Sequence, residues 1–239
     1  MNLCHFRVPK SPILFLALIL LASLPALSQR GTLGIDVGQT TDRFGSLSSA
    51  SAVEGILNGK FTVLQGSGKQ GDPSLVAGGE FRFPEDTSTH ARELAGFVGP
   101  EFHFGNLMLG FHGQARKIYL PTSQVNGFTF VRNNQLFLEL PAVAEYKFGQ
   151  DRRAFVRAEG IWEFNPRYSN TNNGTSAFPN PHLDHGYSLR GTAGYNFPHW
   201  YLRASYESRY FKYGQHIGNP EGLDNWRSDL ISGGIGFVF

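Results

Sequence analysis

The chain has 239 residues, of which 21 are basic and 19 acidic, so its formal net charge is only +2. This balance excludes the basic surface with which a protein neutralises a nucleic-acid backbone. The single cysteine, Cys4, excludes a disulfide framework and leaves no thiol for metal binding or catalysis in the rest of the chain.

The first 28 residues have the pattern of a secretory signal peptide. Arg7 and Lys10 precede an apolar run over residues 13–24, and a small-residue exit ends at Ser28. A cationic start, an apolar run and small residues at the cleavage site are the features of a removable export signal. The run is shorter than the roughly 20 residues that a spanning helix needs, which argues against a retained anchor. We therefore expect a signal peptide at 1–28 and a single domain at 29–239.

After this segment, apolar and polar residues alternate with a period of two over segments of about ten residues, a pattern typical of membrane β-barrels. Ten strands are expected, at residues 31–41, 59–66, 73–83, 94–104, 107–118, 135–148, 153–164, 186–197, 200–212 and 228–239. The segment 59–66 is the weakest. If it and 31–41 do not pair, eight strands remain and the start becomes a periplasmic arm or plug.

The lengths of the connections also alternate. Short turns at 105–106, 149–152 and 198–199 fall on one side, and long loops after residues 118, 164 and 212 fall on the other. Bacterial membrane barrels combine an even number of strands with short periplasmic turns and longer outer loops. The sequence therefore predicts an all-β fold, a closed antiparallel up-and-down transmembrane β-barrel of ten strands in a bacterial outer membrane.

A soluble barrel or sandwich with its apolar face inside is the alternative to this arrangement. Here the apolar face is rich in glycine, alanine and aromatic residues, and the opposite face carries charges of both signs. Lipid requires apolar side chains on the outside of a closed sheet, so this mixture suits a polar interior. Aromatic residues near strand ends, such as Tyr146, Trp162 and Trp200, are typical of belts at the two membrane interfaces.

Charged residues of the alternating segments are expected to face the barrel interior. They are Glu101, Arg116, Glu139, Glu145, Arg157, Glu159, Glu163, Arg190, Arg203, Glu207 and Arg209. Ionisable groups at membrane depth often mark a conduction route, so one interpretation is a narrow polar pathway or gate. Side chains largely fill a barrel of about eight strands, however, which favours a structural salt-bridge core.

The closing segment alternates apolar residues and ends with Ile235, Phe237 and Phe239. Together with the segment 96–104, it resembles the small outer-membrane β-barrel family, the OmpA-like or porin-like group, and the resemblance extends over essentially the whole mature chain. The resemblance implies that the closing strand is an assembly signal for the barrel-insertion machinery. These motifs are specific for the class of protein and name no activity.

The candidates for catalysis are the loop residues His182, Asp184 and His185, which could act as acid and base. No second acidic pair accompanies them, as an omptin-like protease would need, and no His-Ser arrangement of a lipid-modifying barrel enzyme is found. Two histidines and one aspartate also make a poor metal site. We expect a protein without enzymatic activity or cofactor.

The expected role is structural or the passage of small solutes. The expected partners are outer-membrane lipid and the barrel-assembly machinery, with no nucleic acid. An alternative is adhesion or another surface interaction through the long loops 165–186 and 213–227, because loops carry specificity while a rigid scaffold holds them.

Overall fold

The structure is a computed structural model of the chain. It describes residues 30–44, 49–67, 69–86, 90–119, 123–125, 128–130, 134–149, 151–169, 183–213 and 225–239. The expected signal peptide lies outside the described residues, as does most of the loop that carries His182. Among the described residues, no helix is long and apolar enough to cross a membrane.

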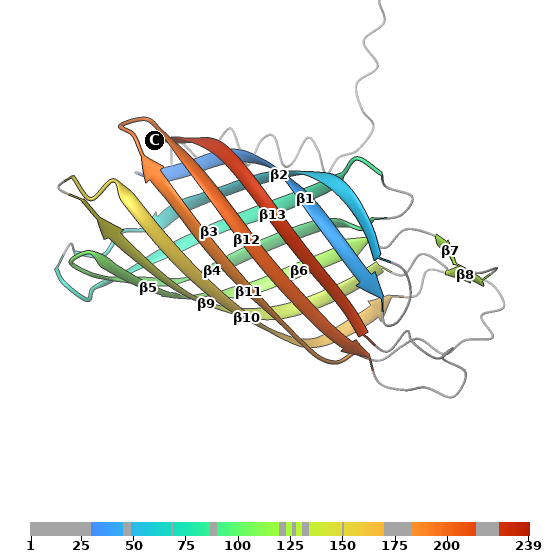
Figure 1. Ribbon diagram of the computed structural model, residues 1–239. Helices are drawn as coiled ribbons and strands as arrows, with labels where there is room; N and C mark the ends of the chain where they lie inside the picture. The colour runs from blue at the N-terminus through green and yellow to red at the C-terminus, as the bar shows by residue number, and fades with distance from the viewer. Residues whose placement is uncertain are drawn as a thin grey trace, which may run out of the picture.

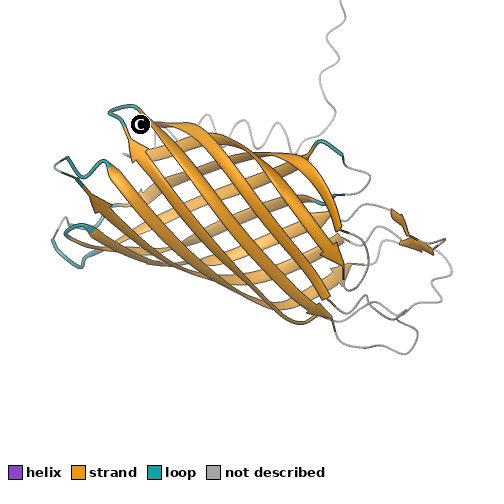
Figure 2. Ribbon diagram, viewed as in Figure 1, coloured by secondary structure: helices purple, strands orange, loops and turns teal. Residues whose placement is uncertain are grey.

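Eleven of the thirteen described strands form one antiparallel sheet that closes on itself (Figures 1 and 2). The strands of this sheet are β1 (Gly31–Phe44), β2 (Ser49–Leu64), β3 (Pro73–Pro84), β4 (Arg92–Phe104), β5 (Leu107–Phe111), β6 (Gly113–Tyr119), β9 (Asn134–Phe148), β10 (Ala154–Ser169), β11 (Leu183–Asn196), β12 (Trp200–Tyr213) and β13 (Asn225–Val238). Each pairs with its neighbours in the chain, and β13 pairs with β1 to complete the ring. The expected closed up-and-down barrel is confirmed.

The segments β5 and β6 act as one strand, because both pair with β4 on one side and with β9 on the other. They are separated only at His112, whose backbone N–H still donates to the carbonyl of Pro141 at 2.9 Å. Pro100 on β4 and Pro141 on β9 flank this break, and proline has no N–H to donate to the ladder. The barrel therefore has ten strands as predicted, and the eight-strand alternative is wrong.

The strand ends differ from the prediction in one consistent direction. The second strand begins at Ser49 rather than at residue 59, and β10 continues to Ser169, five residues into the expected loop. A spanning strand needs only about 9–11 residues, so the extra pairing belongs to the loop end of the barrel. The loop between β6 and β9 also contains a hairpin, β7 (Ser123–Val125) and β8 (Phe128–Phe130), which lies beyond that end (Figure 1).

The strands are strongly tilted. Following paired residues once around the ring from Thr32 of β1 leads through all ten strands and returns to β1 at Phe44, a stagger of 12 residues. A stagger comparable to the strand number corresponds to a tilt of roughly 35–45° and to a narrow barrel. Side chains from opposite walls can therefore meet across the lumen.

The outer face of the ring is apolar. Large hydrophobic residues point away from the lumen on the described strands, and the most exposed include Leu189 at 61%, Ile231 at 66% and Phe237 at 68%. The buried set includes more polar and charged residues than hydrophobic ones. This arrangement is the inverse of a soluble barrel, and a bilayer is the solvent that it suits. The soluble alternative is therefore wrong.

Candidate functional site

Charged side chains cross the middle of the lumen as one set of ion pairs. We call this set the central ion cluster; it consists of Glu80, Arg82, Glu93, Arg116, Glu139, Arg190, Glu207 and Arg209. Four members are acidic and four are basic, so the cluster has no formal net charge. Ions removed from water are stable only when each finds a partner of opposite charge, and this composition meets that requirement.

Glu207 on β12 accepts hydrogen bonds from three arginines of the cluster. Its Oε2 accepts hydrogen bonds from Arg82 Nη2 at 2.7 Å and from Arg190 Nε at 2.5 Å. Its other oxygen, Oε1, accepts from Arg209 Nη2 at 2.7 Å. With only 2% of its surface exposed, Glu207 is a single buried carboxylate that holds three guanidinium groups.

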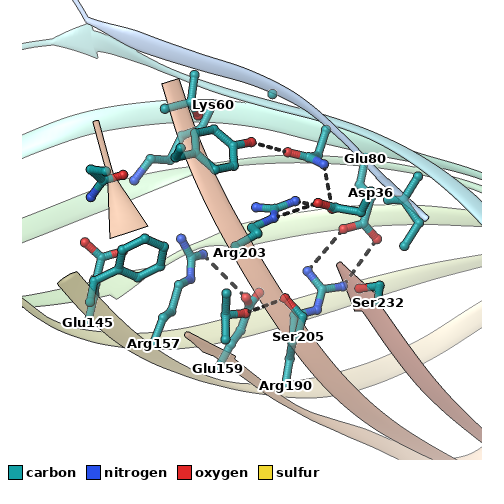
Figure 3. Close-up of a pocket in the computed structure, with 18 of the residues that line it drawn as sticks. Asp36, Lys60, Glu80, Glu145, Arg157, Glu159, Arg190, Arg203, Ser205 and Ser232 are labelled. Atoms are coloured by element: carbon teal, nitrogen blue, oxygen red, sulfur yellow. Dashed lines mark hydrogen bonds and ion pairs between the residues drawn. The ribbon is translucent and has the colours of Figure 1, made fainter. Parts of the chain in front are cut away.

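Two contacts of the cluster join opposite walls of the barrel. Arg190 on β11 donates to Glu80 on β3 at 3.1 Å, and these strands are five apart in either direction around the ring (Figure 3). Arg209 on β12 donates to Glu93 on β4 at 2.7 Å, and these two strands are also five apart. Ion pairs between diametrically opposite strands occupy the axis of the barrel.

The remaining members continue the cluster along the wall formed by β4, β6 and β9. Arg116 donates through Nη1 to Glu93 at 2.7 Å and through Nε to Glu139 at 2.7 Å. Glu139 also accepts a hydrogen bond from Gln114. Arg116 and Glu139 are each 2% exposed. A buried charge-assisted network of this density fixes the positions of its side chains.

An apolar layer covers the cluster on the side of the loops. It consists of Ala91, Ile118, Phe137, Phe211 and Trp226, all buried. Ile118, Phe137 and Phe211 each lie two residues beyond a cluster member on the same strand, so they occupy the next inward position. The rings of Phe137 and Phe211 are 5.2 Å apart, and Phe211 stacks on Trp226 at 4.8 Å. This outer apolar layer lies beside a buried carboxylate, because the Trp226 indole donates to Asp42 at 3.2 Å.

On the side of the short turns, the lumen contains a polar cavity of about 500 Å³ (Figure 3). Cluster members such as Glu80 and Arg190 line its inner end, and the turn residues Asp151 and Arg152 line its mouth. Along its wall Arg203 forms an ion pair with Asp36. This cavity, the periplasmic vestibule, therefore ends at the central ion cluster.

The charged residues that the sequence predicts for the interior divide among these regions. Five of them, Arg116, Glu139, Arg190, Glu207 and Arg209, belong to the central ion cluster. Glu145, Arg157, Glu159 and Arg203 line the periplasmic vestibule. Arg157 contacts Glu159 at 3.4 Å, and Glu145 contacts Lys147 at 3.7 Å.

Glu101 and Glu163 are buried outside the cluster. Glu101 is 3% exposed and accepts hydrogen bonds from Lys60 Nζ at 3.1 Å. Its Oε1 also lies 3.5 Å from His112 Nε2. Glu163 is 3% exposed and accepts from the Ser188 hydroxyl at 3.1 Å. Its Oε2 has no hydrogen-bond partner among the described residues.

Sequence reasoning missed three members of the cluster: Glu80, Arg82 and Glu93. The first two alternate with Phe81 and Phe83 within an expected strand, so the same pattern could have identified them. Glu93 lies one residue before the expected start of its strand, whereas β4 begins at Arg92. The ion pair partners could not be predicted, because they depend on the stagger of the whole ring.

The candidates for catalysis are mostly outside the described residues. His182 is not described, and neither is the side chain of Asp184. The side chain of His185 is described, and its ring centroid lies 6.3 Å from that of Tyr210. Within the described part of the chain, no group of three or more His, Cys, Asp or Glu residues could hold a metal ion.

No family model matches the chain, and no curated protein matches its sequence. Several solved structures of bacterial outer-membrane barrels are similar to it. Neisserial surface protein A is 14% identical, with 87% of this chain and 96% of that chain covered and a TM-score of 0.40. The outer membrane protease OmpT from Escherichia coli is 12% identical, with 89% and 97% covered and a TM-score of 0.41. An outer membrane channel from Pseudomonas putida F1 is 11% identical, with 87% and 95% covered and a TM-score of 0.43.

These likenesses are distant and concern the fold alone. The assignment of the chain depends on its own geometry: a closed ring of ten antiparallel strands, a lipid-compatible outer face and a buried set of ion pairs. The chain is an outer-membrane β-barrel protein.

Proposed function

We propose that this protein is a closed, non-conducting barrel with a structural role in the bacterial outer membrane. The observation that carries the proposal is the pair of ion contacts between opposite walls, Arg190 with Glu80 and Arg209 with Glu93. The outer apolar layer adds a second obstruction on the loop side. A solute entering the periplasmic vestibule would have to break buried ion pairs and then pass the buried side chains of the outer apolar layer.

Planar-bilayer recordings test this proposal. The refolded protein is expected to give no steady current above that of the lipid alone, because both layers block the axis. An open porin inserted in the same bilayer is the control for detection. Steady current from the wild-type protein would contradict a closed barrel and support the passage of small solutes instead.

The role that we propose is not enzymatic. Its support is that the charged groups of the central ion cluster are engaged in ion pairs with one another. Hydrolysis of peptide or lipid A by the purified protein, lost in the His185→Ala variant, would contradict this part of the proposal.

We also propose that the closing strand is recognised by the barrel-assembly machinery. The backbone of Phe239 exchanges hydrogen bonds with Gly31 at 2.7 and 3.0 Å, while 52% of the residue stays exposed. Phe239→Ala keeps these backbone bonds, so it should change the stability of the folded barrel little. We expect it to lower the yield of membrane-inserted protein in cells severalfold.

The matched control is Phe148→Ala, which removes another outward-facing phenylalanine, 44% exposed, at the same end of the barrel. The measurement is the fraction of heat-modifiable protein in isolated outer membranes. Equal losses in the two variants would show a general effect of aromatic residues at the interface and no specific signal.

A further inference from the structure

Charged side chains on the outer face of the barrel gather at its loop end. Alternation with buried neighbours shows which described strand residues point away from the lumen. Those that carry charge are Arg43, Arg92, Lys117, Lys212, Arg227 and Asp229. Five are cations and one is an anion. Each lies within five residues of the end of its strand that faces the long loops.

The opposite end of the same face has a different composition. There the outward-facing positions near the ends of the described strands carry no charge and include Phe104, Phe148, Trp200 and Phe237, whereas the loop end combines aromatic residues such as Tyr210 with the cations. A barrel that met the same lipid headgroups on both sides would have no physical reason for this asymmetry. Short turns mark the periplasmic end, so the cations lie at the outer leaflet.

The cations are concentrated on three adjacent strands. Arg43 on β1 and Arg227 on β13 are directly paired across the sheet, and Lys212 on β12 pairs with Asn225, two residues from Arg227. We call Arg43, Lys212 and Arg227 the outer basic patch. Like charges directly opposite each other in a sheet repel, so this register costs stability unless an anion lies between them.

The protein itself supplies only part of that negative charge. Asp229 contacts Arg227 Nε at 3.0 Å and also accepts a hydrogen bond from the Tyr206 hydroxyl at 3.0 Å. Arg43 and Lys212, both exposed, have no ion pair within the part of the chain that the structure describes. Two cations of the patch are therefore available to an external anion.

We propose that the outer basic patch binds the phosphate of a phosphorylated glycolipid headgroup in the outer leaflet. Its side chains point sideways from the barrel. Toward the middle of the same strands, beyond Thr41 and Asp229, the outward positions become apolar, with Val37 on β1 58% exposed and Ile231 on β13 66% exposed. An anion at the patch thus lies above a surface for acyl chains. This geometry selects an anion attached to lipid. The proposal depends on the membrane placement but not on whether the lumen conducts.

The test measures binding to the folded protein in neutral detergent micelles. Increasing concentrations of diphosphoryl lipid A are expected to raise the midpoint of thermal unfolding, whereas dephosphorylated lipid A and inorganic phosphate should not. Arg43→Gln, Lys212→Gln and Arg227→Gln together should weaken the apparent affinity about 100-fold, because each cation near an anionic lipid contributes about fivefold. Lys69→Gln, which removes an exposed cation from the turn between β2 and β3, is the matched control.

All four substituted positions are exposed, and heat modifiability on a gel confirms that each variant is folded. Retention of wild-type affinity in the triple variant would overturn the proposal, as would an equal loss in Lys69→Gln. A shift with inorganic phosphate as large as that with lipid A would also overturn it, since it would show a site for free anions. None of these results depends on bilayer conductance, so they are distinguishable from failure of the closed-barrel proposal.

Discussion

Replacing Glu207 by glutamine is expected to lower the free energy of unfolding by about 3–5 kcal/mol, the range for removing one partner of a buried ion pair. Glutamine keeps the shape of the side chain but not its charge. Arg82, Arg190 and Arg209 would each lose the carboxylate that they contact, and they would remain buried with an excess of positive charge. Urea unfolding in phospholipid vesicles, followed by tryptophan fluorescence, measures the change.

The control is Asp151→Asn at a periplasmic turn. Asp151 is 67% exposed and contacts Arg153 at 3.6 Å, so solvent screens this pair. Exposed pairs contribute about 0–1 kcal/mol, and the control should stay within that range. If Glu207→Gln were as mild as Asp151→Asn, the lumen would contain enough water to solvate the arginines, and the closed-barrel proposal would lose its basis.

The identity of the fold could be predicted because a membrane barrel repeats one simple rule. Each strand alternates lipid-facing and lumen-facing residues, so the pattern around Leu189 or Leu140 is visible without knowledge of the partner strands. The weak point was β2, where the outward positions near its start include Ser51 and Gly55. Small residues give little contrast in hydrophobicity, and the strand therefore appeared ten residues too late.

The organisation of the interior could be predicted only in part. Alternation indicates that Arg190 and Glu80 face inward, but not that they meet. That contact requires ten strands and a stagger of 12 residues, which bring β3 and β11 to opposite walls at the same height. The division into a vestibule, an ion cluster and an apolar layer follows from the same stagger. It is a property of the closed ring and of no single strand.

The two faces of the barrel have complementary physical requirements. The lumen can hold buried ions because every member of the cluster finds an opposite charge within the ring. A charge on the outer face would find no such partners in hydrocarbon. Among the strand residues whose side chains the structure describes, outward-facing charge is confined to the loop end, as at Arg43 and Arg227. A substitution that places a charge in the middle of the outer face is therefore the most direct test of the membrane assignment.

Val37→Arg is expected to lower the stability of the barrel in phospholipid vesicles by about 2–4 kcal/mol, the range for arginine on the lipid face at the bilayer midplane. Val37 is 58% exposed and lies midway along β1, where its paired neighbours are Gly55 and Gly233. The side chain of Val37 already points outward, and Gly233 leaves open space beside it, so there is room for the longer side chain. Urea unfolding in vesicles measures the loss.

Thr41→Arg is the matched control, because it lies on the same strand and the same face, four residues nearer the loop end. Its paired neighbour on β13 is Asp229, which offers a counter-charge. Near the interface the cost should fall to about 0–1 kcal/mol. On a water-exposed surface, both substitutions would stay within about 0.5 kcal/mol of wild type. Two equally small effects would therefore show that water, not lipid, surrounds the barrel.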